Sequence, residues 1–215
     1  PNMSYKTIST NPKKPICKSR SLVTIVVAYR DREEHIIPFL HYMHNFLQNQ
    51  YREYCIIFSE QIDSGQFNRG KLLNAAFEIA SSKHYIQNEK LGRSRFSQTS
   101  SNCFIFHDVD SLPEDPRNLY DCFGYQANRM YDKVRKYKYE TQVNHGYVTS
   151  GGIVSIPAVQ YRRINGHPNR IFGWGGEDHE MSKRLRKYDY LDTRTTIKNE
   201  IAPERYFKND YMNNY

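Results

Sequence analysis

The stretch that decides the fold is Leu22-Val23-Thr24-Ile25-Val26-Val27-Ala28, an unbroken run of apolar and β-branched residues. Such a run is typical of a strand that is buried on both faces of a parallel sheet. Two shorter runs of the same kind follow it, at Tyr54–Ser59 (YCIIFS) and Cys103–His107 (CFIFH). We therefore predict three buried strands.

Between these strands the apolar residues recur at helical spacing. A first helix is predicted from Glu33 to Asn49, with Pro38 placed to begin or bend it. A second is predicted after Asn68, a residue type that caps helices, with an apolar face made by Leu72, Leu73, Ala76, Phe77 and Ala80. The alternation of strands and helices predicts an α/β fold, a mainly parallel central sheet flanked by helices.

The remaining segments are less regular. Residues 1–20 are polar and read as an extended lead-in to a single domain over residues 21–215. Residues 81–101 are polar and predict a surface loop. A glycine-led strand is predicted over Gly151–Ile156, and a helix over Glu177–Tyr188 with acidic residues in its first turn.

Composition narrows the class of partner. The 215 residues carry 31 Lys+Arg and 23 Asp+Glu, a net charge of +8 that favours anionic partners such as nucleic acid, a membrane surface or a phosphorylated small molecule. The basic residues are dispersed, so we expect no nucleic-acid partner. No apolar run reaches the length of a membrane span, so we expect no membrane contact within these residues. Because the sequence starts at Pro1, we expect a piece of a longer protein, truncated at both ends.

Ligands of an open parallel sheet bind at the carboxyl ends of its strands, and two clusters of charged residues follow predicted strands there. Tyr29-Arg30-Asp31-Arg32-Glu33-Glu34-His35 offers two arginines for phosphate oxygens, or else a charged helix start with internal salt bridges. His107-Asp108-Val109-Asp110 offers carboxylates for a divalent cation bound to a diphosphate, or else an Asp-rich turn.

Two further clusters combine aromatic, glycine and charged residues. Phe172-Gly173-Trp174-Gly175-Gly176-Glu177-Asp178-His179-Glu180 suggests an aromatic platform for a sugar beside a carboxylate base, or else a glycine-rich turn with Trp174 in the core. Phe67-Asn68-Arg69-Gly70-Lys71 places a ring and an arginine at a helix start, which suits a nucleotide.

Taken in order, the four clusters resemble the β-1,4-galactosyltransferase family. That family typically reads P-F-R-x-R-x-E-H, then F-N-R-x-K-L-L-N, then D-V-D, then G-W-G-G-E-D-D. The counterparts here are residues 28–35, 67–74, 108–110 and 173–179, and the likeness runs from about Cys17 to about Leu191.

The resemblance implies a GT-A fold (the Rossmann-like fold of nucleotide-diphospho-sugar transferases) in a Golgi type II membrane enzyme. It implies an inverting transferase that uses Mn²⁺ and a UDP-sugar and acts on a glycan acceptor. It assigns the donor to residues Ala28, Tyr29, Arg30, Asp31, Arg32, Phe67, Asn68, Arg69, Asp108, Val109, Asp110, Thr149 and Trp174. It assigns the acceptor to Trp174, Gly176, Glu177, Asp178 and His179.

The same resemblance implies chemical roles. Asp178 matches the family's catalytic base, with Glu177 beside it, and Asp110 matches a metal ligand. The chemistry agrees, because direct displacement needs a base for the acceptor hydroxyl and a cation for the departing diphosphate. The four cysteines alone allow three pairings, but the resemblance implies a Cys103–Cys122 disulfide and leaves Cys17 and Cys55 as thiols.

The sequence also departs from the family's pattern. No histidine follows His179, although the family completes its metal site with a later histidine. His179 stands where the family has a third acid, and Thr149 stands where the vertebrate members have a donor-gating tyrosine. The small Thr149 leaves room for an N-acetyl group, so we expect UDP-galactose or UDP-N-acetylgalactosamine as donor. The alternatives are a non-catalytic UDP-sugar or glycan binder and a basic nucleic-acid-binding module.

Overall fold

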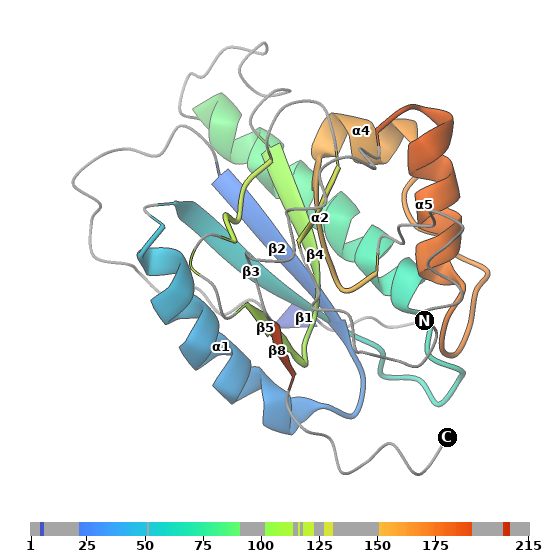
Figure 1. Cartoon of the computed structure of the whole chain (residues 1–215), viewed down its shortest axis with the longest axis horizontal. Helices are drawn as coiled ribbons and strands as arrows, with labels where there is room; N and C mark the ends of the chain where they lie inside the picture. Colours follow the sequence, from blue (N-terminus) through green and yellow to red (C-terminus); the bar gives the residue numbers. More distant parts are fainter. Residues whose placement is uncertain are drawn as a thin grey trace, which may run out of the picture.

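Six strands form the sheet at the centre of the protein (Figure 1), in the order β1-β3-β2-β4-β7-β6. The computed structural model describes residues 5–6, 22–50, 52–90, 102–113, 116, 118–122, 127–130, 151–190 and 204–206. The strands of this sheet are β1 (Tyr5–Lys6), β2 (Leu22–Tyr29), β3 (Glu53–Glu60), β4 (Asn102–Asp108), β6 (Asn128–Met130) and β7 (Ile153–Pro157). A second sheet pairs β5 (Ser111–Pro113) with β8 (Glu204–Tyr206).

The three predicted buried strands lie side by side and parallel. β2 pairs with β3 on one side, where Val26 is opposite Ile57, and with β4 on the other, where Val26 is opposite Phe106. The strands β1, β7 and β6 add antiparallel pairings at the two sides of this parallel centre. The carboxyl ends of β2, β3 and β4 therefore share one edge of the sheet, as predicted.

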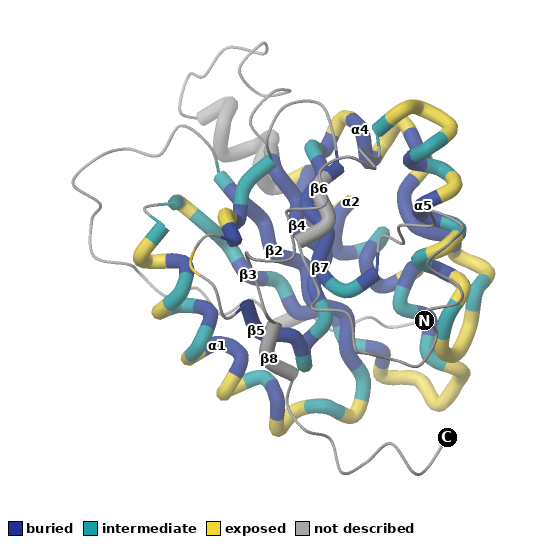
Figure 2. The backbone as a smooth tube through the Cα atoms, in the orientation of Figure 1, coloured by how far each residue is buried: buried dark blue, intermediate teal, exposed yellow. Residues whose placement is uncertain are grey.

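Helices cover both faces of the sheet and bury its apolar side chains (Figure 2). On one face, Val23, Ile25 and Val27 of β2 pack in the same core as Phe39 and Met43 of α1 (Glu33–Gln48). On the other, Val26 and Ala28 join apolar residues of α2 (Arg69–Lys90), α4 (Ala158–Arg163) and α5 (Glu177–Lys187). Successive residues of β2 thus enter opposite cores, which explains why its whole run is apolar.

Three details of the helices differ from the predictions. Helix α2 continues to Lys90, so the loop predicted from residue 81 is wrong for residues 81–90, and residues 91–101 lie outside the described part. The segment holds no Gly or Pro before Gly92 and is rich in good helix formers, so nothing in it ends the helix. Pro38 does not begin α1, because the helix starts five residues earlier, at Glu33. The short α4 was not predicted at all.

A disulfide joins Cys103 of β4 to Cys122, as the resemblance implied. Cys55, half-buried in β3, retains its thiol, and Cys17 lies outside the described residues. Among the helices that the structure describes, no segment has the length and hydropathy that crossing a bilayer requires.

Candidate active site

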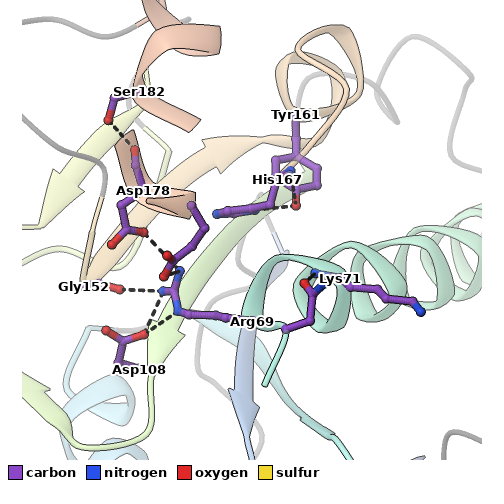
Figure 3. A network of polar contacts seen from close by, with 10 residues as sticks. Arg69, Lys71, Asp108, Gly152, Tyr161, His167, Asp178 and Ser182 are labelled. Atoms are coloured by element: carbon purple, nitrogen blue, oxygen red, sulfur yellow. Dashed lines mark hydrogen bonds and ion pairs between the residues drawn. The ribbon is translucent and has the colours of Figure 1, made fainter. Parts of the chain in front are cut away.

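The four clusters singled out in the sequence converge on the edge where β2, β3 and β4 end. Arg32, after β2, lies 3.6 Å from the carboxylate of Asp110, which follows β4. Arg69, at the start of α2, contacts Asp108 at the end of β4 and Asp178 in the first turn of α5 (Figure 3). One site therefore gathers residues from distant parts of the chain, and the contact between Arg69 and Asp178 alone spans 109 positions.

Arg69 is the centre of a polar network. Its Nε and Nη2 donate to the same Oδ1 of Asp108, over 2.9 and 2.7 Å. Its Nη1 donates to Oδ1 of Asp178 over 3.2 Å, and Nη2 also reaches the carbonyl oxygen of Gly152 at 3.4 Å. Burial acts to lower the pKa of Arg69, but the surrounding carboxylates outweigh it and raise that pKa above its ordinary value, so the guanidinium stays charged.

The two predicted catalytic acids occupy the first turn of α5. Gly176 caps this helix with φ 92, a conformation that favours glycine. The side chain of Glu177 is only 11% exposed, and burial followed by the charge of Asp178 raises the pKa of its carboxyl. Asp178 is 27% exposed at its side chain and faces the network (Figure 3). Of the two, Asp178 is the carboxylate that a solvent-borne hydroxyl can reach, which suits a general base.

A second group of residues makes a ring-and-cation surface beside the network. The guanidinium of Arg30 donates from Nη1 to the carbonyl oxygen of Gly65 and lies 5.7 Å from the centre of the Phe67 ring. Gly173 donates its backbone N–H to the carbonyl oxygen of Phe67 over 2.8 Å, which joins this surface to the tryptophan loop. An aromatic ring next to a guanidinium suits a nucleoside diphosphate.

Asn68 begins α2 and anchors it. Its Oδ1 accepts from the N–H of Lys71 over 2.9 Å, which is the predicted N-cap, and its Nδ2 donates to the carbonyl oxygen of Asn169 over 2.8 Å. Its own N–H donates to Oε1 of Gln61, a buried residue that sequence reasoning missed. Gln61 organises the loop before Asn68, because its Nε2 also donates to Asp63 and to the carbonyl oxygen of Gln66.

Asp110 is the candidate metal ligand. Burial, and then the charge of Asp108, raise the pKa of the Asp110 carboxyl, while Arg32 lowers it. A bound divalent cation would reverse this raised pKa, and carboxylate oxygens are the ligands that Mn²⁺ accepts. In the described part of the chain, no group of three or more His, Cys, Asp or Glu residues is arranged to hold a metal. Asp110 by itself would supply one carboxylate ligand to a divalent cation.

Trp174 is a surface residue, with 99% of it exposed. The alternative that it fills the core is therefore wrong. Three glycines with φ of 78, 89 and 92 surround it at positions 173, 175 and 176, so its loop has a backbone that other residues rarely adopt. Phe172 in the same loop is 54% exposed. An exposed ring four residues before Asp178 leaves the sugar platform as a prediction.

The other predicted site residues occupy varied environments. Ala28, Tyr29 and Val109 are buried at the strand ends, where they belong to the hydrophobic cores on the two faces of the sheet. Asp31 is exposed and has φ 51. Gly176 and His179 are exposed at the start of α5. Thr149 lies outside the described residues.

Sequence reasoning gave no role to two buried histidines, His107 and His167, although it placed His107 at the end of a predicted buried strand. His107 donates from Nδ1 to the carbonyl oxygen of Asp108 and accepts at Nε2 from the hydroxyl of Tyr120, both over 2.8 Å. His167 contacts the hydroxyl of Tyr161 at 2.7 Å. Burial lowers the pKa of His107 to about 4, which keeps it neutral. The predicted strand Cys103–His107 already implied that His107 is buried.

Comparisons with known proteins show the family of the chain. The family described as the N-terminal region of glycosyl transferase group 7 matches residues 4–123, and the N-terminal domain of galactosyltransferase matches residues 128–203. Relatives include β-1,4-galactosyltransferase 5 of Sus scrofa, 32% identical over 83% of this chain and 41% of its own. β-1,4-Galactosyltransferase 1 of Mus musculus is 34% identical over 79% of this chain and 38% of its own. The chain thus spans about two fifths of these relatives' length.

A solved structure shows the same fold. The catalytic domain of Drosophila β-1,4-galactosyltransferase 7, in complex with xylobiose, superimposes with a TM-score of 0.67 at 25% identity, covering 89% of this chain and 72% of that one. A mutant of the same Drosophila enzyme was solved with manganese, UDP-Gal and xylobiose, and it has the same TM-score at 24% identity. The GT-A fold is therefore confirmed, and the chain belongs to the β-1,4-galactosyltransferase family, glycosyl transferase group 7.

Proposed function

We propose that this chain carries the catalytic domain of an inverting, Mn²⁺-dependent transferase. It moves galactose, or N-acetylgalactosamine, from a UDP-sugar to a terminal sugar of a glycoprotein, glycolipid or proteoglycan, in β-1,4 linkage. The observation that carries the proposal is the joining of Asp108, next to the candidate metal ligand, to Asp178, the candidate base, by one guanidinium. The candidate base for the acceptor hydroxyl and the candidate metal ligand for the departing diphosphate would then lie on either side of Arg69.

The donor would bind along the edge of the sheet. Phe67 and Arg30 would receive the nucleotide, and Arg32 would face the diphosphate near Asp110. Ala28, Tyr29, Asp31, Asn68, Asp108 and Val109 would form the walls of this part of the site. Asp110 would hold Mn²⁺, which stabilises the charge of the departing diphosphate when it is bound.

The acceptor would lie between the tryptophan loop and the start of α5. The exposed ring of Trp174 would support a sugar, with Gly176, Glu177 and His179 around it. Asp178 would take the proton from the acceptor hydroxyl as that oxygen bonds to the anomeric carbon. The bond from that carbon to the diphosphate oxygen breaks at the same time, and UDP leaves. A single displacement of this kind inverts the anomeric carbon.

The comparisons support the chemistry at the level of the family. The solved mutant of the Drosophila enzyme held manganese, UDP-Gal and xylobiose, a donor and an acceptor of the classes proposed here. We propose from Thr149 alone that the protein accepts UDP-N-acetylgalactosamine as well as UDP-galactose. Comparable transfer rates from the two donors would support this, and strict rejection of UDP-N-acetylgalactosamine would contradict it. Residence in the Golgi membrane with a lumenal catalytic domain is proposed from family membership.

The test uses the purified full-length protein with Mn²⁺, each UDP-sugar and a panel of N-acetylglucosamine, glucose and xylose glycosides. Mass spectrometry of the products would show the addition of one hexose or N-acetylhexosamine. The proposal predicts transfer from at least one donor to at least one acceptor, and loss of transfer when Mn²⁺ is chelated. UDP binding without transfer to any member of the panel would instead support the non-catalytic binder.

A further inference from the structure

We propose that Arg69 is a positioning residue. It holds the base Asp178 near the end of β4, the strand that precedes the candidate metal ligand Asp110, and it does not contact the donor diphosphate. The inference rests on the proposed function, because Asp178 needs positioning only if it is the base. It assigns Arg69 a task different from that of Arg30 and Arg32.

The guanidinium donors of Arg69 are committed to protein oxygens. An arginine has five N–H donors in a fixed plane. The one on Nε points to Asp108, and Nη2 contacts both Asp108 at 2.7 Å and the carbonyl oxygen of Gly152 at 3.4 Å. Nη1 contacts Asp178 at 3.2 Å and Glu177 at 4.0 Å. All three nitrogens already contact oxygens of this chain, so a phosphate would have to compete with them.

Burial separates the three arginines of the site. The side chain of Arg69 is 11% exposed, while those of Arg30 and Arg32 are 21% and 31% exposed. Arg69 is also surrounded by three carboxylates, Asp108, Glu177 and Asp178, whose negative charge would repel a diphosphate placed beside them. Arg30 and Arg32 are therefore the better placed cations for the donor.

Arg69 connects four elements of the fold at this point. Asp108 ends β4, Gly152 directly precedes β7, and Asp178 lies in the first turn of α5, while Arg69 itself begins α2 (Figure 3). The planar fork sets the separation of the Asp108 and Asp178 carboxylates. A lysine would keep the positive charge but would reach only some of these oxygens, because an ammonium has no fork.

The test compares Arg69→Lys and Arg69→Met with Arg30→Met in the full-length protein. Two quantities are measured: the dissociation constant of UDP with Mn²⁺ by calorimetry, and kcat at saturating donor and acceptor. Melting temperatures establish that each variant is folded. We expect both Arg69 variants to keep the UDP dissociation constant within about twofold and to lose about 100-fold in kcat, the scale of a misplaced catalytic group. Arg30→Met should instead weaken UDP about tenfold, as the loss of a charged hydrogen bond does.

The opposite pattern would overturn the inference. If Arg69→Lys retains the wild-type kcat, Arg69 does not position the base through its fork. If Arg69→Met weakens UDP binding as much as Arg30→Met does and keeps kcat, then Arg69 is a phosphate ligand. If Arg69→Met does not fold, Arg69→Lys decides through the same two measurements. A wild-type protein that transfers nothing would refute the proposed function and this inference with it, whereas an active wild type with the opposite pattern would refute this inference only.

Discussion

Gly151 lies directly against the carboxylate of Asp178. A β-carbon added at Gly151 would lie 2.6 Å from Oδ2 of Asp178 and 3.1 Å from its Cγ, closer than real β-carbons approach other atoms. Arg69 holds the other oxygen of the same carboxylate, Oδ1, at 3.2 Å. The Asp178 carboxylate thus lies between the backbone at Gly151, where a side chain would not fit, and the guanidinium of Arg69.

The first prediction follows from this contact. Gly151→Ala should push Asp178 away from its place and lower kcat by about 10- to 100-fold, while the protein remains folded. Gly152→Ala is the matched contrast, because a β-carbon there meets nothing within 4 Å but φ is 74. Gly152→Ala should lower the stability more than Gly151→Ala does, and it should lower kcat less. Steady-state kinetics and thermal melting of the two variants would decide, and equal kcat losses would contradict the account.

The exposure of Trp174 separates its role from stability. Because Trp174 is 99% exposed, Trp174→Ala should change the melting temperature by no more than about 1 °C. It should raise the acceptor KM by about tenfold or more, as the loss of a large aromatic contact does. Val159→Ala, at a 44% exposed apolar residue on α4, is the control that should change neither quantity. An unchanged acceptor KM in Trp174→Ala would remove the sugar platform from the account.

Asn68 should matter for stability as well as for the site. Asn68→Ala removes the cap of α2 and the hydrogen bond to the carbonyl oxygen of Asn169, for a loss of about 1 to 3 kcal/mol in the free energy of unfolding. Asn68→Asp keeps an oxygen for the N–H of Lys71 but cannot donate to Asn169, so its loss should be intermediate. Urea unfolding measures all three proteins. A loss below about 0.5 kcal/mol in Asn68→Ala would show that these bonds contribute little.

The buried His107 predicts a pH dependence of stability. Its ordinary pKa of 6.5, which applies in the unfolded chain, falls to about 4 on folding because of burial. The unfolded state therefore binds a proton that the folded state does not. The contribution of neutral His107 to the free energy of unfolding is fully present above pH 6.5. It is lost as the pH falls toward 4, to a total on the order of 3 kcal/mol.

His107→Gln should flatten that dependence. We expect the free energy of unfolding of the variant to decline less steeply than that of the wild type between pH 6.5 and 4. His167, whose pKa burial also lowers, stays in both proteins and cancels in the difference. Denaturant unfolding at a series of pH values measures the two slopes, and identical slopes would mean that His107 does not titrate in this range.

The central strands and the place of the site were predictable because their causes are local. The runs at Leu22–Ala28 and Cys103–His107 are apolar on both faces, and parallel pairing brings the residues that follow them to one edge. The clusters at Arg30 and Asp108 were found for the same reason, because each directly follows one of these buried strands. Asp178 was found differently, as an acid at the start of a predicted helix, next to glycines and Trp174.

What the sequence could not predict depends on contacts between distant residues. The close contact between Gly151 and the Asp178 carboxylate joins positions 27 residues apart, and nothing in the sequence near either residue signals it. The engagement of Arg69 with three carboxylates was likewise invisible, so its motif suggested only a phosphate contact. The end of α2 was placed too early because a polar composition was taken for a loop, although no residue there breaks a helix.

The most direct test of the central claim is galactosyl transfer by Asp178→Asn. Asparagine keeps the shape of Asp178 and an oxygen for Arg69, but it cannot take a proton from the acceptor hydroxyl. We expect the full-length variant to bind UDP with Mn²⁺ as the wild type does, to melt at the same temperature, and to lose about 1,000-fold or more in kcat. Transfer within about tenfold of the wild-type rate would contradict the assignment of Asp178 as the base.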